Sequence, residues 1–403
     1  SVCLDYAHRN YGDCTNCFRK GIIEATKKEG CTMVVGWHRP TRLHIDTQAI
    51  TENVQKECQR LPEGTALFAV VKANGYGHGA VESAKAAKKG GATGFCVALL
   101  DEAIELREAG VQDPILILSV VDLAYVPLLI QYDLSVTVAT QEWLEAALQQ
   151  LTPESNTPLR VHLKVDTGMG RIGFLTPEET KQAVRFVQSH KEFLWEGIFT
   201  HFSTADEIDT SYFEKQAGRF KAVLAVLEEL PRYVHVSNSA TALWHPDVPG
   251  NMIRYGVAMY GLNPSGNKLA PSYALKPALR LTSELIHVKR LAAGEGIGYG
   301  ETYVTEAEEW IGTVPIGYAD GWLRHLQGFT VLVNGKRCEI VGRVCMDQCM
   351  IRLAEEVPVG SVVTLVGKDG NEENTLQMVA EKLETIHYEV ACTFSQRIPR
   401  EYN

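Results

Sequence analysis

Short apolar runs alternate with longer segments of helical spacing from Leu67 to about residue 255. Near-continuous apolar runs of this length are typical of parallel strands that are buried on both faces of a sheet. The expected strands span residues 67–71, 94–99, 114–119, 134–139, 160–165, 194–199, 233–236 and 252–255. The expected helices between them include residues 80–90, 101–110, 141–151, 177–190 and 212–230. This succession of strand-and-helix units predicts a (β/α)8 TIM barrel, although periodicity alone leaves an open doubly wound sheet as an alternative.

A different pattern begins after Lys276-Pro277, where strand-like runs are separated by Gly and Asn-Gly turns. Only residues 375–383 have a helical pattern in this part of the chain. The expected fold class is therefore α/β, with a TIM barrel followed by a mainly β C-terminal domain that has antiparallel connections. The expected domains are an N-terminal extension at 1–32, a barrel domain at 33–278 and a β domain at 279–403. Residues 33–46 are a candidate for pairing with the β domain.

Composition narrows the classes of function. The 403 residues carry a formal net charge of -10, which disfavours a nucleic-acid partner. No apolar stretch approaches the length of a membrane span, so we expect a cytoplasmic protein without a membrane partner. Four of the ten cysteines lie in the first 32 residues, where Cys14-x-x-Cys17 is a weak zinc signal. Irregular spacing favours an extension without a metal, and the other cysteines fit reduced core residues.

Polar and charged residues gather where the expected barrel strands end. They are Lys72, Asn74, Tyr76 and His78 after the first strand, Lys164, Asp166 and Arg171 at the fifth, Thr200 and His201 at the sixth, His235, Asn238 and Ser239 at the seventh, and Arg254 and Gly256 at the eighth. A single lysine at such a place is usually a rim residue. Together, these side chains predict a cationic cluster at the carboxyl rim of an otherwise apolar barrel, where barrel active sites lie. Such a cluster indicates an anionic ligand, because a charge without a partner is costly to desolvate.

The residue types at the last two strand ends indicate a phosphate group. Loops after the seventh and eighth strands of a barrel commonly bind phosphate through backbone N–H groups, and Ser239 and Gly256 suit such a site. Lys72 adds a nucleophile at the end of the first strand. A lysine that forms a Schiff base, with an Asp or Arg partner for the pyridine nitrogen, is the signature of pyridoxal phosphate. Arg254 is the candidate for that partner.

Longer motifs resemble those of the alanine racemase family over residues 39–402. The stretch "AVVKANGYGHG" around Lys72 resembles the family's cofactor-lysine motif, and "KVDTGMGRIG", "THFSTADE", "HVSNSA" and "IRYGVAMYG" follow in family order. In the β part, "GYGETY", "PIGYADG", "GRVCMDQCM" and "HYEV" complete the match. The first 38 residues lie outside the resemblance.

The resemblance implies a pyridoxal 5′-phosphate enzyme that interconverts L-alanine and D-alanine. Lys72 would hold the cofactor covalently, and Lys72 and Tyr299 would be the two catalytic residues. Cofactor contacts are implied for Lys72, Tyr76, Arg171, His201, Asn238, Ser239, Arg254, Gly256, Val257 and Tyr388. The resemblance implies substrate contacts for Arg171, Met346 and Asp347, and carbamylation for Lys164. Tyr318, Arg324 and Arg343 would line the channel that leads to the site. The resemblance implies no metal.

Family members are homodimers, so the resemblance also implies active sites that two chains share, with Tyr299 of one chain near the lysine of the other. Lys72 and Tyr299 would then act as bases on opposite faces of the substrate. Arg254 cannot accept a proton at any ordinary pH, so it would leave the pyridine nitrogen unprotonated and favour proton removal and return. The D-alanine would supply bacterial cell-wall peptidoglycan synthesis.

Other functions on the same fold stay open. A decarboxylase of basic amino acids would normally carry a carboxylate where this chain has Arg254. Serine racemases of the membrane-anchored type carry Asn in place of Tyr388, whose phenol would crowd a hydroxymethyl group. A non-catalytic pyridoxal-phosphate-binding protein would lack the β part. A metal-dependent barrel hydrolase would need a His-x-His pair or a carboxylate cluster at the strand ends. Alanine racemisation is the prediction that agrees with all of these residues.

Overall fold

Parallel strands close into a barrel in the computed structural model, which describes residues 34–151 and 157–403. The barrel strands are β2 (Ala66–Val70), β3 (Gly94–Val97), β4 (Ile115–Ile117), β5 (Ser135–Val138), β6 (Leu159–Lys164), β7 (Phe193–Phe199), β8 (Tyr233–Ser237) and β9 (Met252–Tyr255). The last strand, β9, pairs in parallel with β2, which completes the ring. The predicted TIM barrel is therefore confirmed, and the open doubly wound sheet is excluded. The possible zinc ligands around Cys14 lie outside the described residues.

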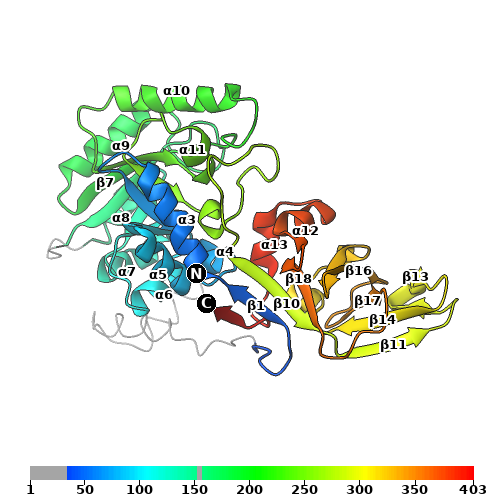
Figure 1. Cartoon of the computed structure of the whole chain (residues 1–403). Helices are drawn as coiled ribbons and strands as arrows, with labels where there is room; N and C mark the ends of the chain where they lie inside the picture. Colours follow the sequence, from blue (N-terminus) through cyan, green and yellow to red (C-terminus); the bar gives the residue numbers. More distant parts are fainter. Residues whose placement is uncertain (1–33, 152–156) are drawn as a thin grey trace, which may run out of the picture.

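Helices connect the strands and cover the outside of the barrel (Figure 1). They are α3 (Thr47–Arg60), α4 (Lys72–Tyr76), α5 (Ala80–Gly90), α6 (Leu100–Glu108), η1 (Leu123–Tyr125), α7 (Val126–Gln131), α8 (Gln141–Leu148), α9 (Pro177–Ser189), α10 (Ser211–Ala225), α11 (Ser239–Trp244) and η2 (Val257–Tyr260). The start of α9 shows how sequence sets these bounds. The Thr176 hydroxyl accepts the N–H of Glu179, whose carboxylate accepts the N–H of Thr176 in return, and Pro177 occupies the first turn.

The predicted helices at 141–151 and 212–230 are both too long. The first, α8, ends at Leu148. The pattern at 212–230 predicts a helix to residue 230, but α10 ends at Ala225. The chain turns there, because the N–H of Val226 bonds to the carbonyl of Val223 three residues back, at 3.3 Å. The helix-like spacing of the apolar residues continues past the point where the backbone stops being helical.

The inside of the barrel is partly polar, so the expectation of an otherwise apolar barrel is wrong. On β6, Leu159, Val161 and Leu163 belong to the core that faces the helices. Arg160, His162 and Lys164 alternate with them and therefore face the interior of the barrel. An apolar interior cluster remains on the other side and consists of Phe68, Val70, Cys96, Leu116, Tyr233 and Met252. The barrel thus holds charge in its centre as well as at its rim.

The C-terminal part is built around a large, mostly antiparallel sheet with the order β11-β14-β17-β16-β15-β18-β10-β1-β20. Its strands are β1 (Arg42–Ile45), β10 (Leu279–Glu284), β11 (His287–Leu291), β14 (Glu309–Val314), β15 (Thr330–Val333), β16 (Lys336–Val341), β17 (Cys349–Leu353), β18 (Val362–Asp369) and β20 (Arg400–Tyr402), with β19 (Glu372–Asn374) beside β18 and a separate pair, β12 (Gly296–Ile297) and β13 (Tyr303–Val304). β1 pairs antiparallel with β10 and parallel with β20. Residues that precede the barrel therefore lie in the sheet of the C-terminal part.

Short helices complete the C-terminal part. They are η3 (Tyr299–Glu301), η4 (Tyr318–Asp320), η5 (Arg324–Leu326), α12 (Leu376–Lys382) and α13 (His387–Thr393). The expectation of a single helical segment at 375–383 is wrong, because α13 is a second one. Its seven residues are too few to give a clear helical period, and it is stabilised by packing against α4 of the barrel. A Cβ on Gly77, just after α4, would lie 2.1 Å from the carbonyl oxygen of Ala391 in α13.

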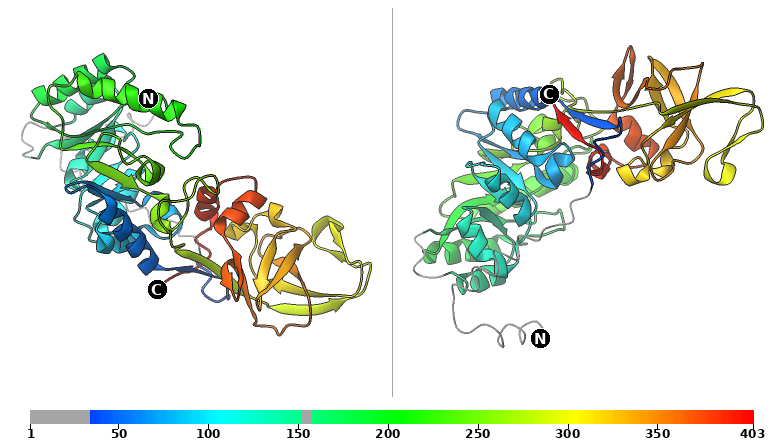
Figure 2. Two further views of the ribbon diagram at one scale, coloured as in Figure 1. Left: turned by 45° about the horizontal axis from the view of Figure 1, so that its top comes forward. Right: turned by 90° about the horizontal axis from the view of Figure 1, so that it is seen from below.

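The molecule is elongated, with the barrel at one end and the strands from β11 to β17 at the other (Figure 2). The helices α12 and α13 lie between the barrel and these strands, on the side where α4 leaves the barrel (Figure 1). In the part of the chain that the structure describes, helices that combine the length and the apolar character needed to cross a bilayer are absent.

Candidate active site

A cavity of about 980 Å³ lies at the carboxyl ends of the barrel strands. The predicted site residues of the barrel line it together, and so does Tyr388 from α13: they are Lys72, Tyr76, Lys164, Arg171, His201, Asn238, Ser239, Arg254, Gly256, Val257 and Tyr388. The remaining wall combines apolar side chains such as Leu118 and Phe199 with polar ones such as Asp206. Residues at or just after the ends of five barrel strands thus meet in one place because the parallel strands all end at the same rim, and α13 adds Tyr388 from the C-terminal part.

Lys72 begins α4 directly after β2, and the backbone that follows it takes an uncommon conformation. Residues 73–77 all have φ between 52° and 83°, so the chain makes a left-handed turn. Residues other than glycine rarely adopt this backbone conformation, and strained backbone of this kind is concentrated at functional sites. The Asn74 amide oxygen accepts the first N–H of α5 at 3.0 Å, and the Glu102 carboxylate accepts the N–H of Ala73 at 2.6 Å. These bonds hold the turn and, with it, the direction of Lys72.

The environment of Lys72 favours its neutral amine. Burial lowers the pKa of Lys72, and the nearby Arg171 guanidinium lowers it further. A lysine with a lowered pKa is a better nucleophile and base near neutral pH than an exposed one. This is the property that a covalent attachment point requires.

Backbone N–H groups converge beside the start of α11. The Ser239 hydroxyl oxygen accepts the N–H of Gly256 at 2.9 Å and that of Ala258 at 3.4 Å. A Cβ on Gly256 would lie 2.9 Å from the Tyr76 hydroxyl, so only glycine leaves room here. The Tyr388 ring lies 6.3 Å from that of Tyr76, centroid to centroid. Convergent N–H donors, two phenols and a small hydroxyl fit a phosphate group in both shape and hydrogen-bonding capacity.

Arg254 is a buried cation at the floor of the cavity, with 4% of its surface exposed. Its guanidinium donates to the Nδ1 of His235 at 2.7 Å and to the carbonyl of Thr200 at 3.0 Å. A longer bond of 3.3 Å reaches the Nδ1 of His201. Burial lowers the pKa of Arg254 to about 10, which still leaves it charged at neutral pH. Burial keeps the pKa of His201 and of His235 well below the usual value, and the charge of Arg254 lowers both further. Both rings are therefore neutral.

Lys164 is a second buried lysine, with 2% of its surface exposed. Its amine donates to the carbonyl of Val165 at 2.9 Å and lies 5.4 Å from the centre of the Phe199 ring. Burial lowers its pKa to about 7, with a further contribution from the charge of Arg254. A substantial fraction of this amine is therefore uncharged at neutral pH.

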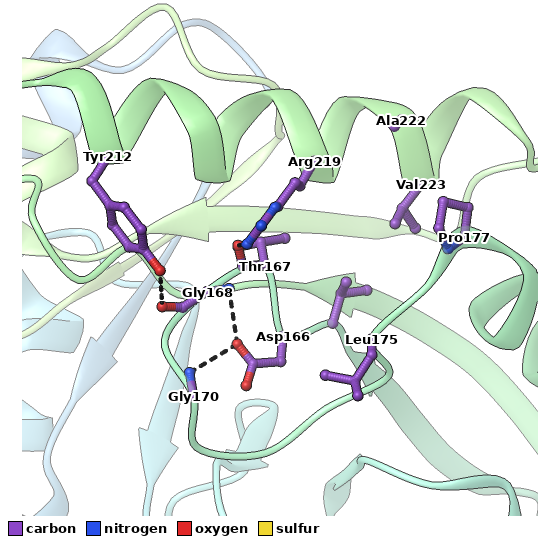
Figure 3. Close-up of a pocket in the computed structure, with 11 residues that line it drawn as sticks. Asp166, Thr167, Gly168, Gly170, Leu175, Pro177, Tyr212, Arg219, Ala222 and Val223 are labelled. Carbon is purple, nitrogen blue, oxygen red and sulfur yellow. Dashed lines mark hydrogen bonds between the residues drawn. The ribbon is translucent and has the colours of Figure 1, made fainter.

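The loop that carries Arg171 is built around Asp166 (Figure 3). The Asp166 carboxylate accepts the N–H groups of Gly168, Gly170 and Arg171 at 2.9–3.0 Å. From α10, the Tyr212 hydroxyl donates to the Gly168 carbonyl at 2.8 Å, and Arg219 donates to the preceding carbonyl. A second hollow, of about 570 Å³, lies between this loop and α10. The sequence motif around Arg171 thus specifies a loop that is held from both sides.

Apart from Tyr388, the predicted site residues from the β part lie away from this cavity in the described chain. Tyr299 is 69% exposed and Met346 is 52% exposed. The Asp347 carboxylate accepts a bond from Arg397 at 2.7 Å. Tyr318 is exposed, and Arg324 and Arg343 line a different hollow of about 700 Å³. One chain therefore assembles the barrel half of the predicted site and leaves the other half on its surface.

The sequence analysis did not identify three residues that support the site: two glutamates and one histidine. Glu102 caps the strained turn after Lys72, and His162 and Glu196 extend the polar contacts of His235 into the barrel. The alternation of Arg160, His162 and Lys164 was a visible signal for polar side chains inside the barrel. No comparable local signal marks Glu102, because its partner lies 29 positions earlier in the chain.

The closed barrel with an added β part and a buried cationic cavity at its carboxyl rim are features of a barrel enzyme. Comparison with known proteins gives the family. A model of the alanine racemase N-terminal domain matches residues 45–264, and one of the alanine racemase C-terminal domain matches residues 278–402. The chain belongs to the alanine racemase family and is an amino-acid racemase.

Individual relatives agree with the family models. The chain is 57% identical to the alanine racemase of Levilactobacillus brevis over 92% of its own length and 100% of the relative's. It is 50% identical to that of Listeria monocytogenes over the same shares of the two chains. A crystal structure of alanine racemase from Bacillus anthracis with bound L-Ala-P matches at a TM-score of 0.86 and 44% identity, over 91% of this chain and 95% of that one. A histidine racemase from Leuconostoc mesenteroides matches at a TM-score of 0.87 and 32% identity, over 92% and 99%.

Proposed function

We propose that the chain interconverts L-alanine and D-alanine with pyridoxal 5′-phosphate bound at the barrel rim. The observation that carries this proposal is the single cavity where Lys72, Arg254 and the N–H groups around Ser239 converge. Relatives at 50–57% identity that are named alanine racemase support the choice of substrate. When bound, pyridoxal phosphate supplies an electron-withdrawing ring that acidifies the Cα proton of an attached amino acid.

The residues of the cavity divide into those that hold the cofactor and those that orient it. Lys72 would hold it covalently through Nζ, and Arg254 would face the pyridine nitrogen. The phosphate would be bound by the backbone of Gly256 and Val257, by the Ser239 hydroxyl and by the phenols of Tyr76 and Tyr388. His201 and Asn238 would be further contacts of the cofactor. Because Arg254 donates hydrogen bonds only, it would leave the pyridine nitrogen without a proton and favour proton return to Cα over side reactions.

Two bases would move the proton of the substrate. The lowered pKa of Lys72 makes its Nζ able to accept the Cα proton on one face. The partner subunit's Tyr299 would act at its hydroxyl oxygen on the other face. The exposure of Tyr299 supports this sharing, since a single chain leaves it in solvent. We therefore propose a homodimer in which each site uses two chains.

The substrate carboxylate would be bound by cations and by the partner surface. Arg171 lines the cavity and would form the ion pair, with Met346 and Asp347 adding contacts from the β part. Tyr318, Arg324 and Arg343 would line the channel that leads to the site. We propose that the buried Lys164 reacts with carbon dioxide to form a carbamate, because an uncharged amine is available there and the anion would pair with Arg171.

Several wider properties belong to the same proposal. The barrel domain would span residues 33–278, of which β1 pairs with strands of the β domain, and the β domain would span residues 279–403, with residues 1–32 as an extension. The enzyme would work in the cytoplasm and supply D-alanine for bacterial cell-wall peptidoglycan. Tyr388 would disfavour serine, because its phenol reduces the room for a hydroxymethyl group.

Proton NMR of L-alanine with the protein and pyridoxal phosphate in heavy water tests the activity. Loss of the α-proton signal together with formation of D-alanine is the expected result. Serine and histidine are run in parallel, since a histidine racemase shares this fold at 32% identity. A persistent alanine signal alongside exchange on histidine or serine would refute alanine as the substrate. Persistence on all three would refute catalysis.

A further inference from the structure

A row of four buried polar side chains runs from the cavity into the barrel. Arg254 Nη1 lies 2.7 Å from His235 Nδ1, and His235 Nε2 lies 2.9 Å from His162 Nδ1. His162 Nε2 then lies 3.1 Å from the Glu196 carboxylate. Each of the four side chains is at most 4% exposed. Water therefore does not compete for these bonds, and each donor must meet an acceptor.

The two ends of the row have fixed roles. A guanidinium can only donate hydrogen bonds, and an ionised carboxylate can only accept them. Burial opposes ionisation of Glu196, but hydrogen bonds from His162 and Ser135 and the charge of Arg160 outweigh it and hold its pKa at about 2. Arg160 donates to the other carboxylate oxygen of Glu196 at 3.3 Å. Glu196 is therefore the accepting end of the row at any pH near neutral.

The two imidazoles between these ends are neutral. Burial lowers the pKa of His162 and of His235. The hydrogen bond to Glu196 and its charge offset part of this for His162, and the charge of Arg254 lowers the pKa of both rings further, so each pKa stays below its usual value. A neutral imidazole has one N–H donor and one accepting nitrogen. Only one arrangement satisfies all three bonds: both rings carry the proton on Nε2 and accept on Nδ1. The reverse arrangement would turn an N–H of His235 against the N–H of Arg254.

We propose that Glu196 is a positioning residue that acts through His162 to select the His235 tautomer that offers a lone pair to Arg254. The accepting nitrogen of His235 then holds the guanidinium in one orientation, together with the carbonyls of Thr200 and Val236 at 3.0 Å and 3.2 Å. This inference rests on the proposed role of Arg254 as the partner of the pyridine nitrogen. Glu196 itself touches neither substrate nor cofactor, because it lies three bonds of the row away from the cavity.

Neutron diffraction of the holoenzyme crystallised in heavy water tests the proposal directly. The expected map shows deuterium on Nε2 of His162 and of His235, and none on Nδ1 of either ring. Deuterium on Nδ1 of His235 would overturn the proposal. This measurement needs no variant and does not depend on activity, so a protein with the expected deuterium positions but no racemisation would refute the proposed function alone.

A pair of variants tests whether Glu196 makes the selection. Glu196→Leu has a similar volume but offers no acceptor, so the deuterium of His162, and with it that of His235, should move to Nδ1, and the kcat for alanine should fall about tenfold. The KM should change by less than about twofold, because no substrate contact is lost. Glu196→Gln keeps an accepting oxygen and should restore the wild-type deuterium positions, with kcat within about threefold of the wild type. Unchanged deuterium positions in Glu196→Leu would overturn the proposal, and if that variant does not fold, the wild-type map decides.

Discussion

The two halves of the predicted site differ sharply in their surroundings. The barrel residues, such as Lys72, Lys164 and Arg254, are buried or half-buried and meet in one cavity. The β-domain residues, such as Tyr299 and Met346, lie exposed and away from that cavity. Their sequence motifs are equally distinct. A clear sequence motif therefore predicts which residues belong to the site, but it does not predict whether a single chain brings them together.

Burial explains the altered chemistry of the barrel half within one chain. Desolvation lowers the pKa of Lys72, Lys164 and Arg254, because the water that each cation has lost outweighs the weaker opposing charges of Glu102 near Lys72 and of Asp166 near Lys164. An exposed group on the β domain remains in water until another surface covers it. A second copy of the chain is the partner that would complete the site in the same way for both protomers.

Replacing Lys72, the candidate nucleophile of the barrel half, should have the largest effect on activity. Lys72→Ala should lower the rate of D-alanine formation by more than about 10³-fold, because the covalent attachment point and one base are lost together. The rate is measured by chiral analysis of the product. Lys85→Ala is the control, since Lys85 is exposed and pairs only with Glu82 on α5. A Lys72→Ala enzyme that keeps more than a tenth of the activity would place the nucleophile elsewhere.

Mixing two inactive variants tests whether the halves belong to different chains. Tyr299→Phe should also lose most of its activity, because the second base is missing. When Lys72→Ala and Tyr299→Phe dimers exchange subunits, hybrid dimers carry one intact site, so about a quarter of the wild-type activity should return. Subunit exchange is followed with a mass label. Complete exchange without recovery of activity would show that both residues serve the same chain.

The buried Lys164 should respond to carbon dioxide and pH. The uncharged amine reacts with carbon dioxide, and its fraction increases as pH rises through the pKa of about 7. With ¹³C-bicarbonate, a carbamate signal should therefore grow from about pH 6 to about pH 8 and be absent in Lys164→Met. Equal carbamate signals in the wild type and in Lys164→Met would assign the signal to another amine.

A smaller effect should follow from filling the phosphate site. Gly256→Ala places a Cβ 2.9 Å from the Tyr76 hydroxyl and should weaken pyridoxal phosphate binding about tenfold by displacing one phosphate contact. Binding is measured from the absorbance of the bound cofactor after dialysis. Gly218→Ala on α10 is the matched control, since its Cβ meets nothing within 4 Å and should only stabilise the helix by about 1 kcal/mol. Equal cofactor affinity in both variants would argue against a phosphate at Gly256.

Much of this organisation was readable from local pattern. Apolar runs predicted the barrel strands within a few residues, because each strand buries its own hydrophobic surface whatever its neighbours are. Strand-end positions predicted that Lys72, Ser239 and Arg254 would lie together, because parallel strands share one rim. These inferences needed only local sequence patterns and the rule that all strands of a TIM barrel end at the same rim.

Tertiary structure decided the rest. The left-handed turn at residues 73–77 is held by Glu102 from another unit, and the short helix α13 packs against both α12 and α4. The row from Arg254 to Glu196 exists because the closed barrel brings alternate residues of β6, β7, β8 and β9 to one interior. The sequence by itself determined the strands, the lysine at the rim and the family. Contacts between distant segments determined the direction of each side chain, since they depend on closure of the barrel rather than on any local propensity.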